Sequence, residues 1–285
     1  MTESGRIGAL FVVSTPIGNM GDFSFRAVEV LKSVALVLAE DTRHTRHLLD
    51  HYGIATPLAA YHEHNEARTT PGLVSRLQRG ESFALVSDAG TPLLSDPGAR
   101  LVDAALASGV PVIPIPGASA LLAALVASGL DTGRFTFFGF LTRAGRARRV
   151  TLGEITRTGH TVVLYESPQR LAATLAELDA LGNGARPAVV AREMTKQFEE
   201  VRRGTVSELR AYYESHPPRG EIVLMLGGSV MDRVDDDLVR ERLHGLRAGG
   251  MSVRDAAALV SRELGVSRNT AYRLAQAMDA GEPKR

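Results

Sequence analysis

The sequence contains no cysteine and no tryptophan, and aromatic residues make up only 5% of its 285 positions. Without cysteine, disulfide bonds, thiolate zinc sites and cysteine nucleophiles are excluded. The apolar runs are short and broken by Gly, Pro or polar residues, so none predicts a membrane span, and the N-terminus has no signal-peptide pattern. We therefore expect a cytoplasmic protein.

An excess of charge of one sign is also missing, because the formal net charge is +1. Net charge alone therefore does not predict a polyanionic partner, and any contact with nucleic acid must come from local patches. Several histidines are present, among them His62 and His64, but no convincing third ligand accompanies them. We expect no metal site.

Short apolar runs alternate with longer helical patterns along most of the chain. This alternation predicts an α/β fold with largely parallel sheets, since nearly continuous apolar runs are typical of strands covered on both faces. The length suits two such domains, which we place at residues 7–117 and 118–230. The predicted strands are residues 9–15, 36–41, 83–89, 111–117, 135–141, 161–167, 186–195 and 221–228.

The C-terminal segment has a different pattern. Residues 252–278 read as two amphipathic helices around a tight turn, with Ala256, Val260 and Leu274 on their apolar face. This pattern predicts a small helical tail of helix-turn-helix type at residues 235–281.

Nearly every predicted strand ends in a loop rich in Gly, Pro, Ser and Asp. Taken singly, each loop is a structural turn more often than a site. Because ligands of open α/β sheets bind beyond the carboxyl ends of the strands, their joint placement predicts one large cleft. The sequence has no P-loop, no dinucleotide-binding GxGxxG after the first strand and no GxSxG nucleophile elbow, which argues against those three classes.

Seven of these loop motifs together resemble the ribosomal RNA branch of the tetrapyrrole methylase superfamily, over roughly residues 7–228. The motifs are TPIGN (15–19), AEDTRHT (39–45), YHEHNE (61–66), SDAGTPLLSDPG (87–98), PGASA (116–120), YESPQR (165–170) and AREMTK (191–196). The resemblance implies two α/β domains with a cofactor cleft between them, S-adenosylmethionine as the cofactor, and a homodimer. It also implies methylation of the ribose 2′-oxygen of a cytidine in the decoding region of 16S ribosomal RNA, on the small ribosomal subunit.

The same resemblance implies which residues bind the cofactor. Small residues leave the backbone open to close approach by a ligand, and Asp88 is a plausible acceptor, although an Asx turn or helix cap is an equally good reading of that residue alone. The expected cofactor-binding set is Thr15, Pro16, Asp88, Ala89, Gly90, Thr91, Ser119, Ala120, Tyr165, Glu166, Ala191 and Met225.

A ribose hydroxyl is a poor nucleophile, so a group that accepts its proton would assist methyl transfer. The candidates that we carry forward are Glu193, Lys196 and Asp41, while His44, Glu63 and Glu66 are further options. Glu193 and Lys196 are three residues apart, which also permits a structural salt bridge, and Asp41 could equally pair with Arg43. The sequence does not choose among them.

Contact with RNA has two candidate sources. One is a set of basic residues, which could equally be solvated surface residues without a partner. The set comprises Arg43, His44, His62, Arg143, Arg146, Arg148 and Arg149. Arginine offers both phosphate forks and stacking on unpaired bases. The other source is the tail, where Arg268, Asn269 and Arg273 follow the turn, although packing or dimer support is nearly as good a reading.

Two other functions remain open. The same cleft would suit a methyltransferase acting on a tetrapyrrole-like small molecule, and the tail alone would suit a DNA-binding regulator without enzymatic activity. The AEDTRHT and YHEHNE motifs and the arginine-rich loop favour the RNA methyltransferase over both.

Overall fold

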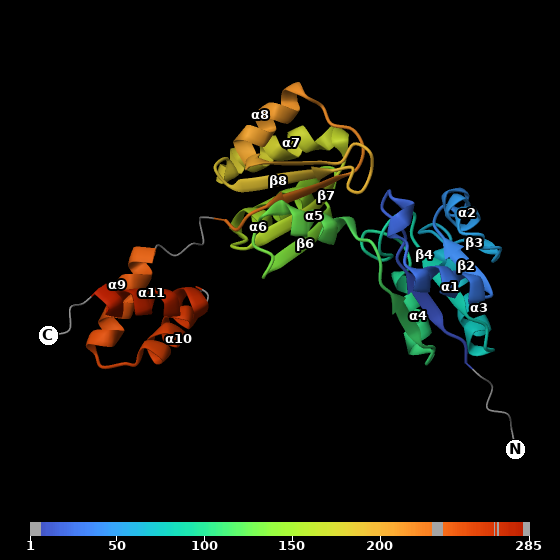
Figure 1. Cartoon of the computed structure of the whole chain (residues 1–285), viewed down its shortest axis with the longest axis horizontal. Coiled ribbons are helices and arrows are strands. Elements are labelled where there is room, and N and C mark those ends of the chain that lie inside the picture. Colours follow the sequence, from blue (N-terminus) through green and yellow to red (C-terminus); the bar gives the residue numbers. More distant parts are fainter. Residues whose placement is uncertain (1–6, 230–235, 265, 267, 282–285) are drawn as a thin grey trace, which may run out of the picture.

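The protein was analysed as a computed structural model, which describes residues 7–229, 236–264, 266 and 268–281. Figure 1 shows three units in a row: two lobes that each contain a sheet, and a helical bundle at the C-terminal end. We call the part that carries β1–β5 the first lobe and the part from α5 to β10 the second lobe. The expected α/β class, with a helical C-terminal segment, is confirmed.

The first lobe contains a five-stranded sheet in the order β3-β2-β4-β1-β5, and all four strand pairs are parallel. Its central strands β2 and β4 are buried at every position, as their continuous apolar runs predict. The strands are β1 (Leu10–Val13), β2 (Leu36–Ala39), β3 (Leu58–Ala60), β4 (Phe83–Val86) and β5 (Val112–Ile115). The helices are η1 (Met20–Asp22), α1 (Phe25–Ser33), α2 (Thr42–His51), α3 (Glu66–Gln78) and α4 (Ala99–Ala107).

The second lobe contains a mixed sheet in the order β6-β7-β10-β8-β9. Only β6 and β7 are parallel, so the expectation of largely parallel sheets is wrong here. The strands are β6 (Phe135–Phe140), β7 (Thr161–Glu166), β8 (Pro187–Arg192), β9 (Glu200–Thr205) and β10 (Ile222–Leu226). The helices are α5 (Ala120–Ser128), α6 (Gly145–Arg157), α7 (Pro168–Leu178), η2 (Asp179–Asn183) and α8 (Val206–Ser215).

For the pair of β8 and β9, the reason for the antiparallel direction is the length of the connection. Only residues 193–199 join β8 to β9, which is too short for the crossover that a parallel pair requires. Two strands, β3 and β9, were not predicted. β9 reads EVRRGT, and its charged residues hide the strand pattern.

Each sheet is covered by apolar side chains on both faces. Leu31, Val37 and Leu49 belong to the core on one face of the first sheet, and Leu77 and Phe83 belong to the core on the other. In the second lobe, α5 buries one side against the sheet through Leu121, Ala124 and Leu125. The helix α5 therefore packs as part of the second lobe.

The C-terminal helices form a bundle with a core of its own. The helices are α9 (Asp236–Ala248), α10 (Val253–Leu264) and α11 (Arg268–Gly281). Val239 and Leu243 of α9 pack against Val260 of α10 and Leu274 of α11. The predicted limits at 230 and 235 lie outside the described residues. Within the described part of the chain, no helix has the length and apolar character needed to cross a bilayer.

Candidate functional site

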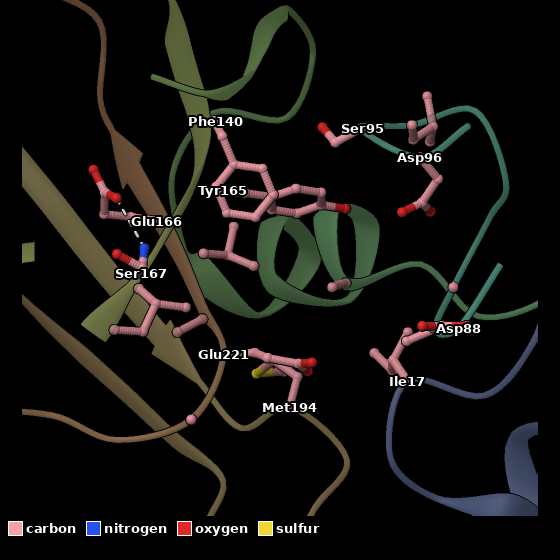
Figure 2. Close-up of a pocket in the computed structure, with 18 of the residues that line it drawn as sticks. Ile17, Asp88, Ser95, Asp96, Phe140, Tyr165, Glu166, Ser167, Met194 and Glu221 are labelled. Atoms are coloured by element: carbon pink, nitrogen blue, oxygen red, sulfur yellow. Dashed lines mark hydrogen bonds between the residues drawn. The ribbon is translucent and has the colours of Figure 1, made fainter. Parts of the chain in front are cut away.

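A cavity of about 400 Å³ lies between the two lobes. That volume falls within the range of small-molecule sites. Figure 2 shows Ile17, Asp88 and Asp96 of the first lobe on one side, and Phe140 and Tyr165 of the second lobe facing them. The cavity therefore opens at the ends of the strands, where the sequence predicted a cleft.

Most of the residues predicted to bind a cofactor line this cavity. They are Asp88, Ala89, Gly90, Thr91, Ala120, Tyr165, Glu166 and Ala191. They come from the loop that follows β4, from the ends of β7 and β8, and from the start of α5. Two lobes distant in sequence thus build one site.

Thr15, predicted for the same set, does not line the cavity but holds the loop that does. It is buried, its hydroxyl donates to the Ser87 carbonyl, and its backbone exchanges two hydrogen bonds of 2.8 and 3.1 Å with Gly90. Gly90 has a φ of +82°, a conformation that favours glycine. Thr15 therefore fixes the backbone of the loop that follows β4.

Three other members of the predicted set also lie off the cavity wall. Met225 is the clearest correction, because its side chain is fully buried in the core with Leu121 and Val163, while its neighbour Val223 lines the cavity. Val223 and Met225 face the same side of the sheet, but Met225 pairs with Val163, in the interior of β7, whereas Ile222 and Val223 pair with Glu166 and Tyr165 at the end that lines the cavity. Pro16 is buried beside Thr15, and Ser119 precedes the first turn of α5.

The first lobe brings carboxylates to the cavity. Glu40, Asp88 and Asp96 all line it, and Asp88 accepts a hydrogen bond of 3.1 Å from the Asp41 amide. Burial, together with the negative charges of Glu40 and Asp88, raises the pKa of Asp96 to about 6. Burial and Asp88 also raise the pKa of Glu40. This side of the cavity suits a cation.

The second lobe contributes an apolar wall. The Tyr165 ring lies 5.5 Å from the Phe140 ring and 4.9 Å from the Phe137 ring, measured between centroids. Met194, Ala191 and Val223 extend the wall. Such a surface suits a flat heterocycle, which aromatic and sulfur-containing side chains contact favourably.

Glu166 lines the cavity by position, but its carboxylate turns inward. One oxygen accepts a 2.8 Å hydrogen bond from the Ser167 amide and the other a 2.7 Å bond from the Thr174 hydroxyl. The Arg170 guanidinium lies 3.5 Å from the first oxygen. These contacts occupy the carboxylate in shaping the turn from β7 to α7, shown at the left of Figure 2.

Two glycines let the lobes meet at the edges of the cavity. A Cβ atom on Gly18 would lie 2.3 Å from Cγ of Lys196, and one on Gly139 would lie 2.9 Å from the Ser95 hydroxyl. The Asn19 amide also donates a 3.2 Å hydrogen bond to the Thr195 hydroxyl. The loops after β4 and after β8 therefore each contact the opposite lobe.

The same two loops contain every described non-glycine residue with a left-handed backbone. These residues are Leu93, Ser95, Glu193 and Thr195, with φ between 52° and 75°. Such conformations are unfavourable for residues with a side chain and persist where the surrounding structure imposes them. The strain is thus concentrated where the lobes join around the cavity.

The predicted proton acceptors Glu193 and Lys196 are paired in one of these loops. Lys196 Nζ lies 2.8 Å from Glu193 Oε1 and 2.9 Å from Glu221 Oε2. Of these three residues, Glu221 lines the cavity. The hydrogen bond from Lys196 lowers the pKa of Glu193. Burial alone would lower the pKa of Lys196, but its hydrogen bonds to Glu193 and Glu221 raise it overall. Both groups are thus held in their charged forms.

Asp41 is held away from the cavity wall, at the start of α2. One carboxylate oxygen accepts from the Arg43 backbone amide at 2.8 Å, and the other accepts from the Arg43 guanidinium at 2.7 Å. These hydrogen bonds from Arg43 hold the pKa of Asp41 well below its usual range. A carboxylate whose two oxygens are both hydrogen-bonded in this way is a poor base. Of the two readings of Asp41, the structure contains the pairing with Arg43.

The arginine-rich segment divides into two kinds of residue. Arg143, Arg146 and Arg149 are exposed, but Arg148 is buried, so its predicted contact with RNA is wrong. The Arg148 guanidinium bonds Glu177, Thr174 and the Thr142 carbonyl, and it ties α6 to α7. Only one of these four arginines faces the interior of the lobe. The number of arginines in the segment does not show which one that is, because the direction of each side chain depends on how the helix packs.

The basic residues of the first lobe lie near the acidic side of the cavity. Arg43 and His44 are exposed on α2. His62 is half-buried, and its charge interacts with Glu40, which lines the cavity. Among the described residues, no group of three His, Asp or Glu side chains is arranged to hold a metal ion.

Several cavity residues were not predicted, although the motifs contain most of them. Asp96 stands in SDAGTPLLSDPG, Glu40 in AEDTRHT and Met194 in AREMTK. Phe140 ends β6, and Glu221 precedes β10. Their position at strand ends was the available signal, but which of the side chains turn into the cavity depends on the packing of two lobes.

The sequence matches two family models. The family described as tetrapyrrole (corrin/porphyrin) methylases matches residues 9–210, and the RsmI C-terminal HTH domain matches residues 233–279. A protein of Synechocystis sp. named ribosomal RNA small subunit methyltransferase I is 43% identical over 96% of this chain and 99% of its own length. A Pseudomonas aeruginosa protein of the same name is 46% identical over 94% and 96%.

Among solved structures, the fold is similar to a uroporphyrin-III C-methyltransferase from Thermus thermophilus complexed with S-adenosyl homocysteine. The TM-score is 0.57, with 21% sequence identity, and the match covers 77% of this chain and 97% of that one. At this identity the likeness establishes the arrangement of the two lobes.

Proposed function

The chain belongs to the tetrapyrrole methylase family, within it to the ribosomal RNA small subunit methyltransferase I group, and from this premise we propose its reaction. It is an S-adenosylmethionine-dependent ribosomal RNA methyltransferase that acts on the ribose 2′-oxygen of a cytidine in the decoding region of 16S ribosomal RNA. The observation that carries the proposal is a cavity between the lobes that joins unpaired carboxylates to an apolar wall.

The residues of the cavity fit S-adenosylmethionine. When bound, this cofactor supplies a methyl group on a positively charged sulfur, which an oxygen nucleophile displaces in line. The carboxylates Glu40, Asp88 and Asp96 would stabilise the positive charges of the cofactor. Tyr165 and Met194 offer the apolar surface that an adenine ring needs. Ala89 and Gly90, whose loop Thr15 fixes, would let the rest of the molecule approach closely because their side chains are small or absent.

The acceptor ribose enters, in this proposal, from the side where the loops of the two lobes meet. Glu193, Lys196 and Glu221 form a charged network there. A lysine so placed stabilises the oxygen of a hydroxyl that is losing its proton, and a carboxylate receives the proton. We retain Glu193 and Lys196 in this role because the hydrogen bonds from Lys196 and from the Glu221 amide both go to the Oε1 atom of Glu193. Arg43 engages both carboxylate oxygens of Asp41, which shapes the start of α2.

The exposed basic residues supply the contacts to RNA in this proposal. Arg143, Arg146 and Arg149 lie at the beginning of α6, which follows β6, and Phe140 at the end of β6 lines the cavity. Arg43, His44 and His62 approach from the first lobe. Together they would hold phosphates on either side of the nucleotide that enters.

We also propose that the protein is a cytoplasmic homodimer, with α/β domains at residues 7–117 and 118–230 and a helical segment at 235–281. The support for a dimer is the apolar character of α5, which buries one side in the second lobe and leaves Leu122 and Val126 on the other side exposed. A contiguous exposed apolar face marks an interaction surface.

The test is transfer of tritium from labelled S-adenosylmethionine to small ribosomal subunits that lack the modification, with the product mapped by ribose-methylation sequencing. We expect label on one cytidine 2′-oxygen in the decoding region. Intact cofactor binding without label on subunits or on RNA would contradict the proposal and direct attention to a tetrapyrrole-like acceptor. Sequence-specific binding to duplex DNA without methylation would indicate a regulator instead.

A further inference from the structure

The C-terminal bundle carries a hollow of about 630 Å³ that is separate from the cavity between the lobes. Four residues line it: Arg254 on α10, and Arg268, Asn269 and Tyr272 on α11. Arg268 and Tyr272 are four residues apart on α11, a spacing that puts them on the same side of the helix. Two helices therefore bring two guanidinium groups, an amide and a phenol ring to one concave surface.

The charge of this hollow is not neutralised by the bundle. Other arginines of the bundle have acidic partners: Arg240 lies 2.9 Å from Asp237, and Arg242 lies 2.8 Å from Glu263. In the described part of the chain, neither Arg254 nor Arg268 has an acidic group within salt-bridge distance. The nearby Asp255 instead accepts a hydrogen bond from Ser252 at the start of α10.

The aromatic ring is equally exposed. Tyr272 keeps 40% of its surface accessible, although α11 buries Ala271, Leu274 and Ala275 in the bundle core. Packing of the bundle core therefore does not explain why the Tyr272 ring is exposed. An exposed ring that shares a hollow with two arginines and an amide matches the chemistry of an unpaired nucleotide: arginines for phosphates, a ring for stacking and an amide for a base edge.

We propose that the hollow formed by Arg254, Arg268, Asn269 and Tyr272 binds an unpaired segment of ribosomal RNA, at a distance from the nucleotide that is methylated. The inference rests on the proposed function for its choice of RNA and extends it with a second contact. A convex recognition helix reads the major groove of a duplex. A concave surface with a stacking ring suits single-stranded RNA better.

The experiment measures binding of the full-length protein to purified small subunits that lack the modification, as a function of salt concentration. We expect R254A/R268A to weaken binding about tenfold at physiological salt and to lower the slope of log affinity against log salt by roughly 1.5, since two phosphate contacts are lost. R240A/R242A removes an equal charge from the same bundle and is expected to leave both quantities unchanged.

The ring is tested separately. Tyr272→Ala is expected to weaken binding at least about fivefold without a change in the salt slope, and Tyr272→Phe to retain the affinity, because stacking needs the ring and not the hydroxyl. Affinity of the free protein for S-adenosylmethionine and the thermal unfolding midpoint should be the same in every variant. An unchanged salt slope for R254A/R268A, or an equal loss in R240A/R242A, would overturn the inference.

A second arm uses 16S ribosomal RNA freed of protein. The inference requires the same ranking of variants on this RNA. If R254A/R268A lost affinity for intact subunits and bound free RNA as the wild type does, the partner would be a ribosomal protein and the inference would be wrong. Failure of the wild type to methylate subunits would instead contradict the proposed function, which makes the two failures distinguishable.

Discussion

The two lobes place their charged groups in opposite ways. The first lobe directs Glu40, Asp88 and Asp96 into the shared cavity, and among the described residues no lysine or arginine forms a salt bridge with any of the three. The second lobe buries Arg148, Glu166 and Arg186 within its own framework, and Arg186 makes hydrogen bonds to the carbonyls of Ile155, Thr158 and Gly227. Burial lowers the pKa of Arg186 to about 10. One lobe thus supplies charge to a ligand, and the other uses charge to hold an apolar wall in place.

The largest effect is expected where the framework of the second lobe is broken. Arg148→Ala removes a buried guanidinium together with its hydrogen bonds to Glu177, to the Thr174 hydroxyl and to the Thr142 carbonyl. We expect a loss of about 3 kcal/mol in the free energy of unfolding. Chemical denaturation followed by circular dichroism measures it. Arg149→Ala, one residue away and exposed, is the control, and an equal loss there would refute the division between buried and exposed arginines.

The next effect concerns the charge of the first lobe. Asp88→Asn keeps an acceptor for the Asp41 amide but removes the negative charge. We expect the dissociation constant for S-adenosylmethionine to rise about 30-fold, since a hydrogen bond to a charged group contributes roughly 2 kcal/mol. Titration calorimetry should find a smaller change for S-adenosylhomocysteine, whose sulfur is neutral. Equal losses for the two ligands would mean that Asp88 does not act through charge on the sulfonium.

A change in the apolar wall should weaken the binding of S-adenosylmethionine and of S-adenosylhomocysteine to the same extent. Tyr165→Ala removes the ring that contacts Phe140 and Phe137. We expect both ligands to bind about tenfold more weakly, because the loss is of apolar contact and not of charge. Tyr165→Phe should bind both as the wild type does. If the alanine variant weakened S-adenosylmethionine far more than S-adenosylhomocysteine, the assignment of the wall to a neutral part of the ligand would fail.

The smallest effect is a dependence on pH. The pKa of Asp96 is about 6 against an ordinary 3.8, so this residue contributes most to stability below about pH 4 and loses that contribution as pH rises through 6. Binding of a cation runs the other way, because it requires the ionised carboxylate. We expect the affinity for S-adenosylmethionine to fall about fivefold between pH 7.5 and 5. Asp96→Asn should flatten that part of the profile, and an unaltered profile would exclude Asp96 as its source.

The sequence was most informative about features that depend on residues close together in the chain. Continuous apolar runs predicted the buried strands β2 and β4, and loops rich in Gly, Pro and Asp predicted a site beyond the strand ends. It was least informative about direction. Met225 follows an apolar strand pattern in which every residue looks alike, and Arg148 stands among arginines that are exposed. Whether each side chain reaches the cavity, the solvent or the core depends on contacts with residues far away in the chain.

The sequence by itself determined the α/β class, the helical C-terminal segment and the motifs that identify the family, because these depend on composition, periodicity and spacing along the chain. Only the tertiary structure decided that Asp96 faces the cavity, that Glu166 turns away from it, and that Gly18 and Gly139 let the lobes meet. The physical reason is that burial and pairing are properties of two surfaces brought together, and neither lobe alone contains the information for both.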